Sequence, residues 1–145
     1  MAETVQNELR VRLVTPDQIF VDGTASAVEL PARSGSLEAL YGHAPLLTEL
    51  GAGEVRLHGG SVGEQRYFVA WGFAEVLPER VTILAESVVA PNAIDVAAAQ
   101  QMLERGQKLW SEAGAESKLY REANRVQQEA EARLSSASSS TPANQ

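Results

Sequence analysis

The hydrophobic period of this chain changes near residue 90, and no single type of secondary structure can satisfy both halves. Residues 8–14 (ELRVRLV) alternate apolar and charged side chains, which is the period of a strand with one face in a core. Similar short apolar runs follow up to residue 87, and glycines and prolines separate them. Many brief strands joined by tight turns predict a β-sandwich or a β-barrel for this half.

From residue 94 onward the apolar residues recur at helical spacing. Two stripes carry this pattern: Met102, Leu103, Gly106, Leu109 and Trp110, and then Leu119, Ala123, Val126, Ala130 and Leu134. Gly114 interrupts the pattern, so we expect the two helices to fold back on each other. Asn92 is a candidate N-cap of the first helix, and Asp95 is expected in its first turn.

The predicted fold class is therefore β + α, an N-terminal β-sandwich followed by a C-terminal antiparallel hairpin of two helices. The expected boundaries are 1–90 for the sandwich, 91–134 for the hairpin and 135–145 for a disordered, serine-rich tail. Both helical stripes are narrow and rich in alanine, so the hairpin buries little apolar area and could change its packing.

Composition excludes several classes of function. The 145 residues contain no cysteine, which rules out disulfides, thiolate zinc sites and thiol nucleophiles. The net charge is −7 and no basic cluster is present, so neither nucleic acid nor anionic lipid is an expected direct partner. No apolar run is long enough to span a membrane, and the first ten residues do not resemble a secretory signal.

Candidate catalytic and metal-binding residues are few. GGSVG at 59–63 formally matches a nucleophile elbow with Ser61 as the nucleophile, but it joins two strand-like runs, where a hairpin loop is expected. His43 and His58 lack close-range spacing for a metal site, and no phosphate-binding loop is present. A serine hydrolase using Ser61 remains an alternative function. A carbohydrate-binding module with Trp71 and Phe73 as an aromatic platform is another.

The segment 8–56 resembles the N-terminal domain of the epsilon chain of F-type ATP synthase, of the bacterial type. The resemblance rests on LVTP at 13–16, LPARSGSLE at 30–38, GHAPLLTEL at 42–50 and the GEV that follows. It continues through WGFAEVLPERVTILAES at 71–87, and the helical segments lie where that family carries two C-terminal helices.

The resemblance implies a non-catalytic subunit of the central stalk, bound to the gamma subunit and the ring of c subunits. Such a subunit transmits rotation between proton flow and ATP synthesis. It lies at the cytoplasmic face of the bacterial plasma membrane and is attached only through the complex. The helical hairpin would contact the alpha and beta subunits and regulate ATP hydrolysis.

The resemblance also implies which residues lie at an interface. The loop 33–42 is expected to face the ring and the stalk, which makes interface candidates of Ser36, Leu37, Glu38, Tyr41, Gly42 and His43. We expect His43 to shape its loop by hydrogen bonding, with Gly42 permitting the turn. Compared with many relatives, Glu38 replaces a glycine and Tyr41 replaces a proline.

Some bacterial members bind ATP at the start of the first helix. Ile94, Asp95 and Ala99 match that motif, but Ala98 stands where it has an arginine. A phosphate would thus lack a bidentate partner at this position. Arg133 is the remaining candidate on the second helix, where Glu129 replaces a second arginine. No cofactor is therefore expected.

Overall fold

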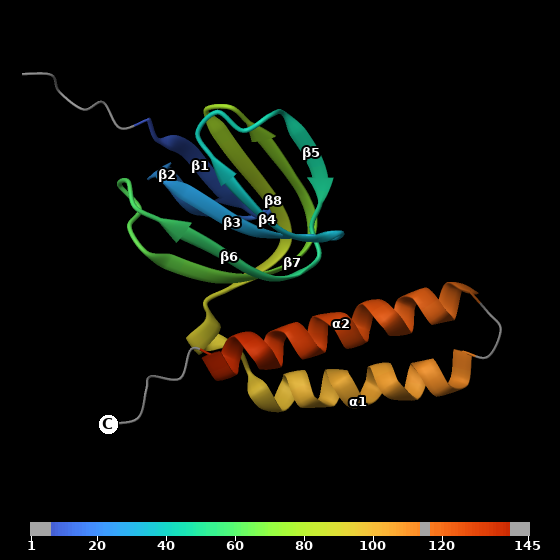
Figure 1. The fold of residues 1–145 in the computed structure, drawn as a ribbon. Helices are drawn as coiled ribbons and strands as arrows, with labels where there is room; N and C mark the ends of the chain where they lie inside the picture. The colour runs from blue at the N-terminus through green and yellow to red at the C-terminus, as the bar shows by residue number, and fades with distance from the viewer. Residues whose placement is uncertain (1–6, 114–116, 140–145) are drawn as a thin grey trace, which may run out of the picture. The chain divides into compact units, whose positions relative to one another are not determined.

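The computed structural model describes residues 7–113 and 117–139. The chain divides into two compact units, Met1–Val88 and Val89–Gln145, which are described separately. Figure 1 shows that the first unit is built of strands and the second of helices.

The first unit is an eight-stranded sandwich, as the sequence predicted. Its strands are β1 Leu9–Val14, β2 Ile19–Ala25, β3 Ala27–Ala32, β4 Gly35–Leu40, β5 Leu46–Glu49, β6 Ala52–His58, β7 Gln65–Leu77 and β8 Arg80–Val89. They follow one another across the sheet in the order β2-β1-β8-β7-β6-β3-β4, and β5 also pairs with β7. Two layers result, and β7 belongs to both of them (Figure 1).

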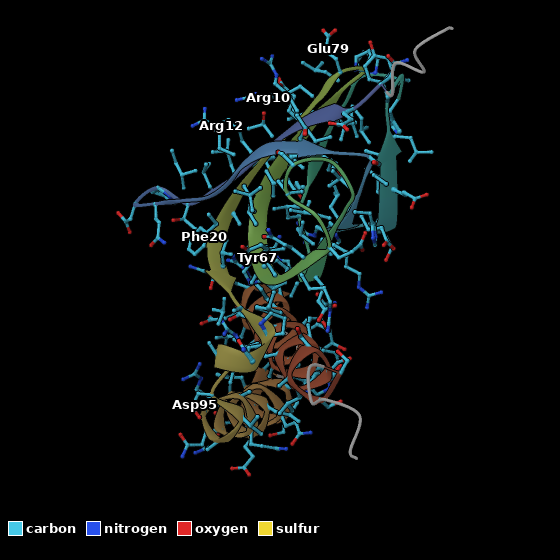
Figure 2. All side chains as sticks on the ribbon, turned by 90° about the vertical axis from the view of Figure 1, so that its left-hand side faces the viewer. Arg10, Arg12, Phe20, Tyr67, Glu79 and Asp95 are labelled. Atoms are coloured by element: carbon cyan, nitrogen blue, oxygen red, sulfur yellow. The ribbon has the colours of Figure 1, made fainter. Side chains whose placement is uncertain are left out.

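The core lies between the layers and follows from the alternation seen in the sequence. In β1 the side chains of Leu9, Val11 and Leu13 are buried, whereas Arg10 and Arg12 are exposed. Figure 2 shows these two arginines projecting outward from β1. Phe20 of β2 and Tyr67 of β7 close one side of the core with an edge-to-face contact, their ring centroids 6.4 Å apart (Figure 2).

Strand β7 changes both its direction and its pattern in the middle. Residues 65–70 pair with β6, and residues 73–76 pair with β5. Between them Trp71 and Gly72 have φ values of 62° and 119°. Before this point the odd-numbered Tyr67 and Val69 face the core, and after it the even-numbered Ala74 and Val76 do. The alternation of inward and outward side chains is therefore shifted by one residue. The pair thus forms a β-bulge that lets one strand serve both layers.

Gly72 is required at this bulge. A Cβ atom there would lie 2.0 Å from the carbonyl oxygen of Leu84, and the φ of 119° is one that L side chains rarely adopt. Trp71, in contrast, is the one non-glycine residue with positive φ among the residues that the structure describes. Its backbone is therefore strained and must be held in place by the surrounding pairs.

The second unit begins with a 3₁₀ turn, Pro91–Ala93, and continues with α1 Val96–Ala113 and α2 Ser117–Ser139. The two helices run side by side as an antiparallel hairpin (Figure 1), which confirms the predicted pairing. The fully buried positions of α1 repeat every seven residues: Ala99, Gly106 and Ala113. On α2, Ala123 and Ala130 are likewise fully buried and seven residues apart.

Small side chains let the helices approach closely. A Cβ atom on Gly106 would lie 2.7 Å from Cγ of Gln127 and 3.1 Å from its backbone nitrogen, so only glycine fits this contact without displacement. Trp110 and Tyr120 stack near the turn with ring centroids 4.0 Å apart. The hairpin is thus held by a seam of small residues and one aromatic pair.

Two local expectations for the hairpin were wrong. Asp95, not Asn92, caps α1: its Oδ1 atom accepts a hydrogen bond from the backbone N–H of Ala98 at 3.0 Å. Asn92 instead lies in the 3₁₀ turn. Helix α2 continues to Ser139, past the expected end at residue 134, because alanine and serine in this segment still follow the helical pattern. The predicted break at Gly114 and residues 140–145 lie outside the described part of the chain.

The expectation of a loop over residues 33–42 was also wrong for most of its length. Residues 35–40 form β4, which pairs with β3 so that Glu38 lies opposite Glu29. Arg33 and Ser34 form the turn that precedes it. Glu38 thus occupies ordinary strand backbone, and only Gly35 and Gly42 in this segment have positive φ.

Candidate docking surface

A row of exposed apolar side chains crosses the outer face of the layer that contains β5, β7, β8, β1 and β2. We call it the apolar row. Its members are Leu47, 70% exposed, Phe73, 51%, Leu84, 54%, and Ile19, 55%, together with the half-buried Val14.

The strand register brings these residues together from distant parts of the sequence. Val14 lies opposite Ile19 of β2 and also opposite Leu84 of β8. Gly72 lies against Leu84, and the next residue, Phe73, is therefore near Leu84. Phe73 then neighbours β5, where Leu47 shares its outward parity. The apolar row therefore draws on five strands, and at its β5 end Glu75 lies opposite Leu47 and Glu49 lies opposite Phe73.

Charged side chains border the apolar row. Arg10 contacts Asp22 at 3.2 Å on β1 and β2, and Arg33 contacts Glu49 at 2.8 Å near β5. All four side chains are largely exposed, so these pairs contribute little to stability. An apolar strip with a polar rim is typical of a surface that another protein covers.

The loop between β4 and β5 adjoins the apolar row and contains three of the predicted interface residues. Gly42 has a φ of 91°, and its N–H donates to the carbonyl oxygen of Pro78 at 2.6 Å, which ties the loop to the β7–β8 turn. Nδ1 of His43 lies 2.6 Å from the carbonyl oxygen of Ala44. Tyr41 is exposed. His43 thus makes the local hydrogen bond expected of a residue that shapes its loop.

The other three predicted interface residues lie on strand β4 and do not share one face. Ser36 and Glu38 point outward and are exposed, whereas Leu37 packs against the sandwich core. Leu37 is therefore a structural residue at this position. The six candidates divide into an outward pair on β4 and a group of three in the β4–β5 loop.

Ser61 has a structural role. Its segment joins β6 to β7 and not a strand to a helix, so it is not a nucleophile elbow. The Oγ atom of Ser61 accepts from the N–H of Thr24 at 2.9 Å, and the N–H of Ser61 donates to Oγ1 of Thr24 at 3.0 Å. This reciprocal pair fastens the β6–β7 loop to β2.

His43 and His58 are not brought into a common site. His58 contacts Glu29 and Glu64 through different ring nitrogens. Among the described residues no group of three or more histidine, aspartate and glutamate side chains is arranged to hold a metal ion.

Trp71 and Phe73 do not form an isolated aromatic platform. Trp71 is half-buried at the bulge, and Phe73 belongs to the apolar row with aliphatic neighbours. The arrangement favours a protein partner over a sugar ring, which a flat, exposed aromatic face would suit better.

The candidate nucleotide-binding residues are buried or make contacts within the hairpin. Asp95 caps α1, and Ile94 is buried. Nε of Arg133 donates to Oε2 of Glu129 at 3.0 Å, so the guanidinium group is partly neutralised within its own helix.

The apolar row was missed in the sequence, although a signal for it is present. Leu13–Val14 and Ile83–Leu84 are apolar doublets inside half-buried strands, and Leu46–Leu47 is a third doublet, in the mostly exposed strand β5. Because successive side chains point to opposite faces, one member of each doublet has to face outward. Three doublets in strands of one layer indicate an apolar outer face.

Comparison with known proteins identifies the family. Residues 8–91 match the family described as ATP synthase, Delta/Epsilon chain, beta-sandwich domain. The ATP synthase epsilon chain of Koribacter versatilis (strain Ellin345) is 44% identical over 117 residues, covering 80% of this chain and 78% of that protein. The epsilon chain of Gloeothece citriformis (strain PCC 7424) is 44% identical over 105 residues, covering 72% and 75%.

A solved structure shows the same fold. A chain in the cryo-EM structure of the Euglena gracilis mitochondrial ATP synthase, OSCP/F1/c-ring, aligns with a TM-score of 0.73 at 17% identity, covering 90% of this chain and 81% of that one. The sandwich, its apolar row and the helical hairpin thus define a protein of the class that docks within a larger assembly. The chain belongs to the ATP synthase epsilon chain family.

Proposed function

We propose that this chain is a rotor subunit in the central stalk of a proton-translocating F-type ATP synthase. It couples rotation of the membrane ring to ATP synthesis without a catalytic site of its own. The relatives at about 40% identity over most of the chain support this role, as does the failure of Ser61 to form a catalytic arrangement. The apolar row is the observation that carries the proposal, since a stalk subunit needs a surface for a permanent partner.

The apolar row is assigned to the gamma subunit. Its continuity with the β4–β5 loop makes Tyr41 and His43 part of the same surface. The ring of c subunits is assigned to the β3–β4 turn together with Ser36 and Glu38 of β4. This turn precedes β4, whereas the β4–β5 loop follows it. Two partners that rotate together require two separate surfaces on the sandwich.

The hairpin is assigned to regulation through the alpha and beta subunits. Its seam of small residues buries little apolar area, so its two packings can differ by only a few kcal/mol. Complexes assembled with the full chain and with a chain lacking residues 92–145 are expected to hydrolyse ATP at different rates. Equal rates under every nucleotide condition would remove the regulatory role and leave the stalk role intact.

The chain is peripheral to the membrane as part of the catalytic sector of the synthase. Neither helix in the described part of the chain is long and apolar enough to cross a membrane. We assign it to the cytoplasmic face of a bacterial plasma membrane, because the relatives quoted above are bacterial.

Co-purification with the gamma subunit tests the stalk role and the assignment of the apolar row. Leu84→Glu places a charge in the middle of the apolar row, where the side chain is 54% exposed and folding should tolerate it. Binding to purified gamma should weaken by about tenfold or more, equivalent to roughly 1.4 kcal/mol. Ser36→Glu adds the same charge to an exposed position on β4 and serves as the control.

Two outcomes contradict the proposal. A wild-type chain that never associates with gamma would remove the stalk role. Gamma binding that survives Leu84→Glu but is lost with Ser36→Glu would move the gamma contact from the apolar row to β4.

A further inference from the structure

His58 bridges two carboxylates that come from different segments of the sandwich. Its Nε2 atom lies 2.6 Å from Oε2 of Glu29 on β3, and its Nδ1 atom lies 2.6 Å from Oε2 of Glu64 in the loop between β6 and β7. The two nitrogens lie on opposite sides of the ring and cannot bind one metal ion together. The cluster is therefore a hydrogen-bonded bridge and not a metal site.

Both contacts can exist together only when the ring is protonated. An ionised carboxylate only accepts hydrogen bonds, and a neutral imidazole has one N–H donor and one acceptor nitrogen. Two carboxylates at hydrogen-bond distance from both nitrogens thus require an imidazolium ion. The hydrogen bond with Glu29, followed by the one with Glu64, raises the pKa of His58 above its usual 6.5.

The surrounding charges are of both signs. Glu29 lies opposite Arg56 of β6 on one side and opposite Glu38 of β4 on the other. Arg56 contacts Glu54 at 3.1 Å, and Arg66 of β7, the register partner of Arg56, also binds Glu54.

Both arginines thus share one carboxylate next to the cluster. Glu29 and Glu64 are the acidic groups that favour the protonated ring of His58.

The two contacts differ in how firmly their carboxylates are placed. Glu29 lies on β3, between β4 and β6, and its side chain is 39% exposed. Glu64 lies at the end of the β6–β7 loop, and its side chain is 74% exposed. When the ring loses its proton, the Nε2–H tautomer can keep Glu29, whereas Nδ1 then presents a lone pair to Glu64 and repels it.

We propose that His58 is a proton-operated clamp that fastens the end of the β6–β7 loop to β3 when protonated and releases Glu64 when neutral. The reciprocal pair of Ser61 and Thr24 holds the tip of the loop in both states. The change is thus confined to the segment between Val62 and Gln65. This inference does not depend on the stalk role.

The linkage has a definite sign. Because the folded-state pKa of His58 is raised, its contribution to stability is complete below about pH 6.5 and is lost as the pH rises through the folded-state pKa. The clamp is therefore closed under mildly acidic conditions and open under alkaline ones.

An NMR titration of the full chain tests the clamp. The ring signals of His58 should titrate at a higher pH than in the urea-unfolded chain, and the amide signals of Gly63 and Glu64 should follow with the same midpoint. Glu64→Gln should lower the His58 midpoint and abolish the response of residues 63 and 64. Glu29→Gln should lower the midpoint further, since Glu29 is the larger cause of the shift.

Glu79→Gln removes an exposed carboxylate in the turn between β7 and β8 and is the matched control. It should leave the His58 midpoint in place. A His58 midpoint equal to that of the unfolded chain would overturn the proposal. So would amide signals of residues 63 and 64 that follow a different midpoint in the wild-type chain.

Discussion

The sandwich and the hairpin are stabilised by side chains of very different size. The sandwich buries leucine, valine and isoleucine from six of its eight strands in one cluster, whereas the buried positions of the hairpin are mostly alanine and glycine. Apolar burial contributes roughly 25 cal/mol per Å², so large side chains make the sandwich a stable platform. The hairpin gains close backbone contact but little buried area. The difference suits a fixed anchor joined to an element that can change its packing.

The largest expected effect comes from truncating the sandwich core. Leu57 of β6 is fully buried, and Leu57→Ala should lower the free energy of unfolding by about 2–5 kcal/mol through lost transfer energy and a cavity. Urea unfolding measures this loss in the free energy of unfolding. Leu47→Ala, which truncates the same side chain in the apolar row, should change stability by no more than about 0.5 kcal/mol. Equal losses would mean that the apolar row is part of the core.

A smaller and more local effect is expected at the seam of the hairpin. Gly106→Leu should force α1 and α2 apart and cost the hairpin about 1–3 kcal/mol, because a Cβ atom already meets Gln127 at 2.7 Å. Amide hydrogen exchange should accelerate in residues 96–113 and 117–139 but not in the core strands. Gln107→Leu, at the neighbouring exposed position, is the matched control. Unchanged exchange in Gly106→Leu would contradict a close-packed seam.

The smallest effect concerns the strained residue of the sandwich. Trp71→Gly and Trp71→Ala both remove the indole ring, but only alanine keeps a Cβ atom at a φ of 62°. The glycine variant should therefore be more stable by about 0.5–1 kcal/mol in urea unfolding, after the greater flexibility of glycine in the unfolded chain is included. The reverse order would show that the backbone relaxes out of this conformation once the ring is removed.

The sequence predicted the features that depend on local pattern. Alternation in β1 and helical spacing after residue 94 gave the two units and the pairing of the helices. Gly106, Ala123 and Ala130 were already placed on the inner stripes. Local pattern could not decide between Asn92 and Asp95 as the cap, because both residue types are good N-caps and lie three positions apart.

Features made by distant segments were not predictable in the same way. The apolar row joins Val14 to Leu84 through a parallel pairing that no single segment specifies. The clamp on His58 needs Glu29 and Glu64 from two other segments. In the sequence, Gly72 separates two apolar runs, QRYFVAW at 65–71 and FAEVL at 73–77, although both belong to the single strand β7. The bulge at Trp71 and Gly72 interrupts the alternation of period two.

That bulge limits how the length of the chain can vary. Losing one residue at positions 71–72 would remove the bulge and keep the parity of the residues after it. Losing both would leave the pairing of residues 65–70 with β6 in place but reverse that parity. Ala74 and Val76 would turn to solvent, while Phe73 and Glu75 would turn into the core. Both the number of residues here and the identity of Gly72 are thus constrained.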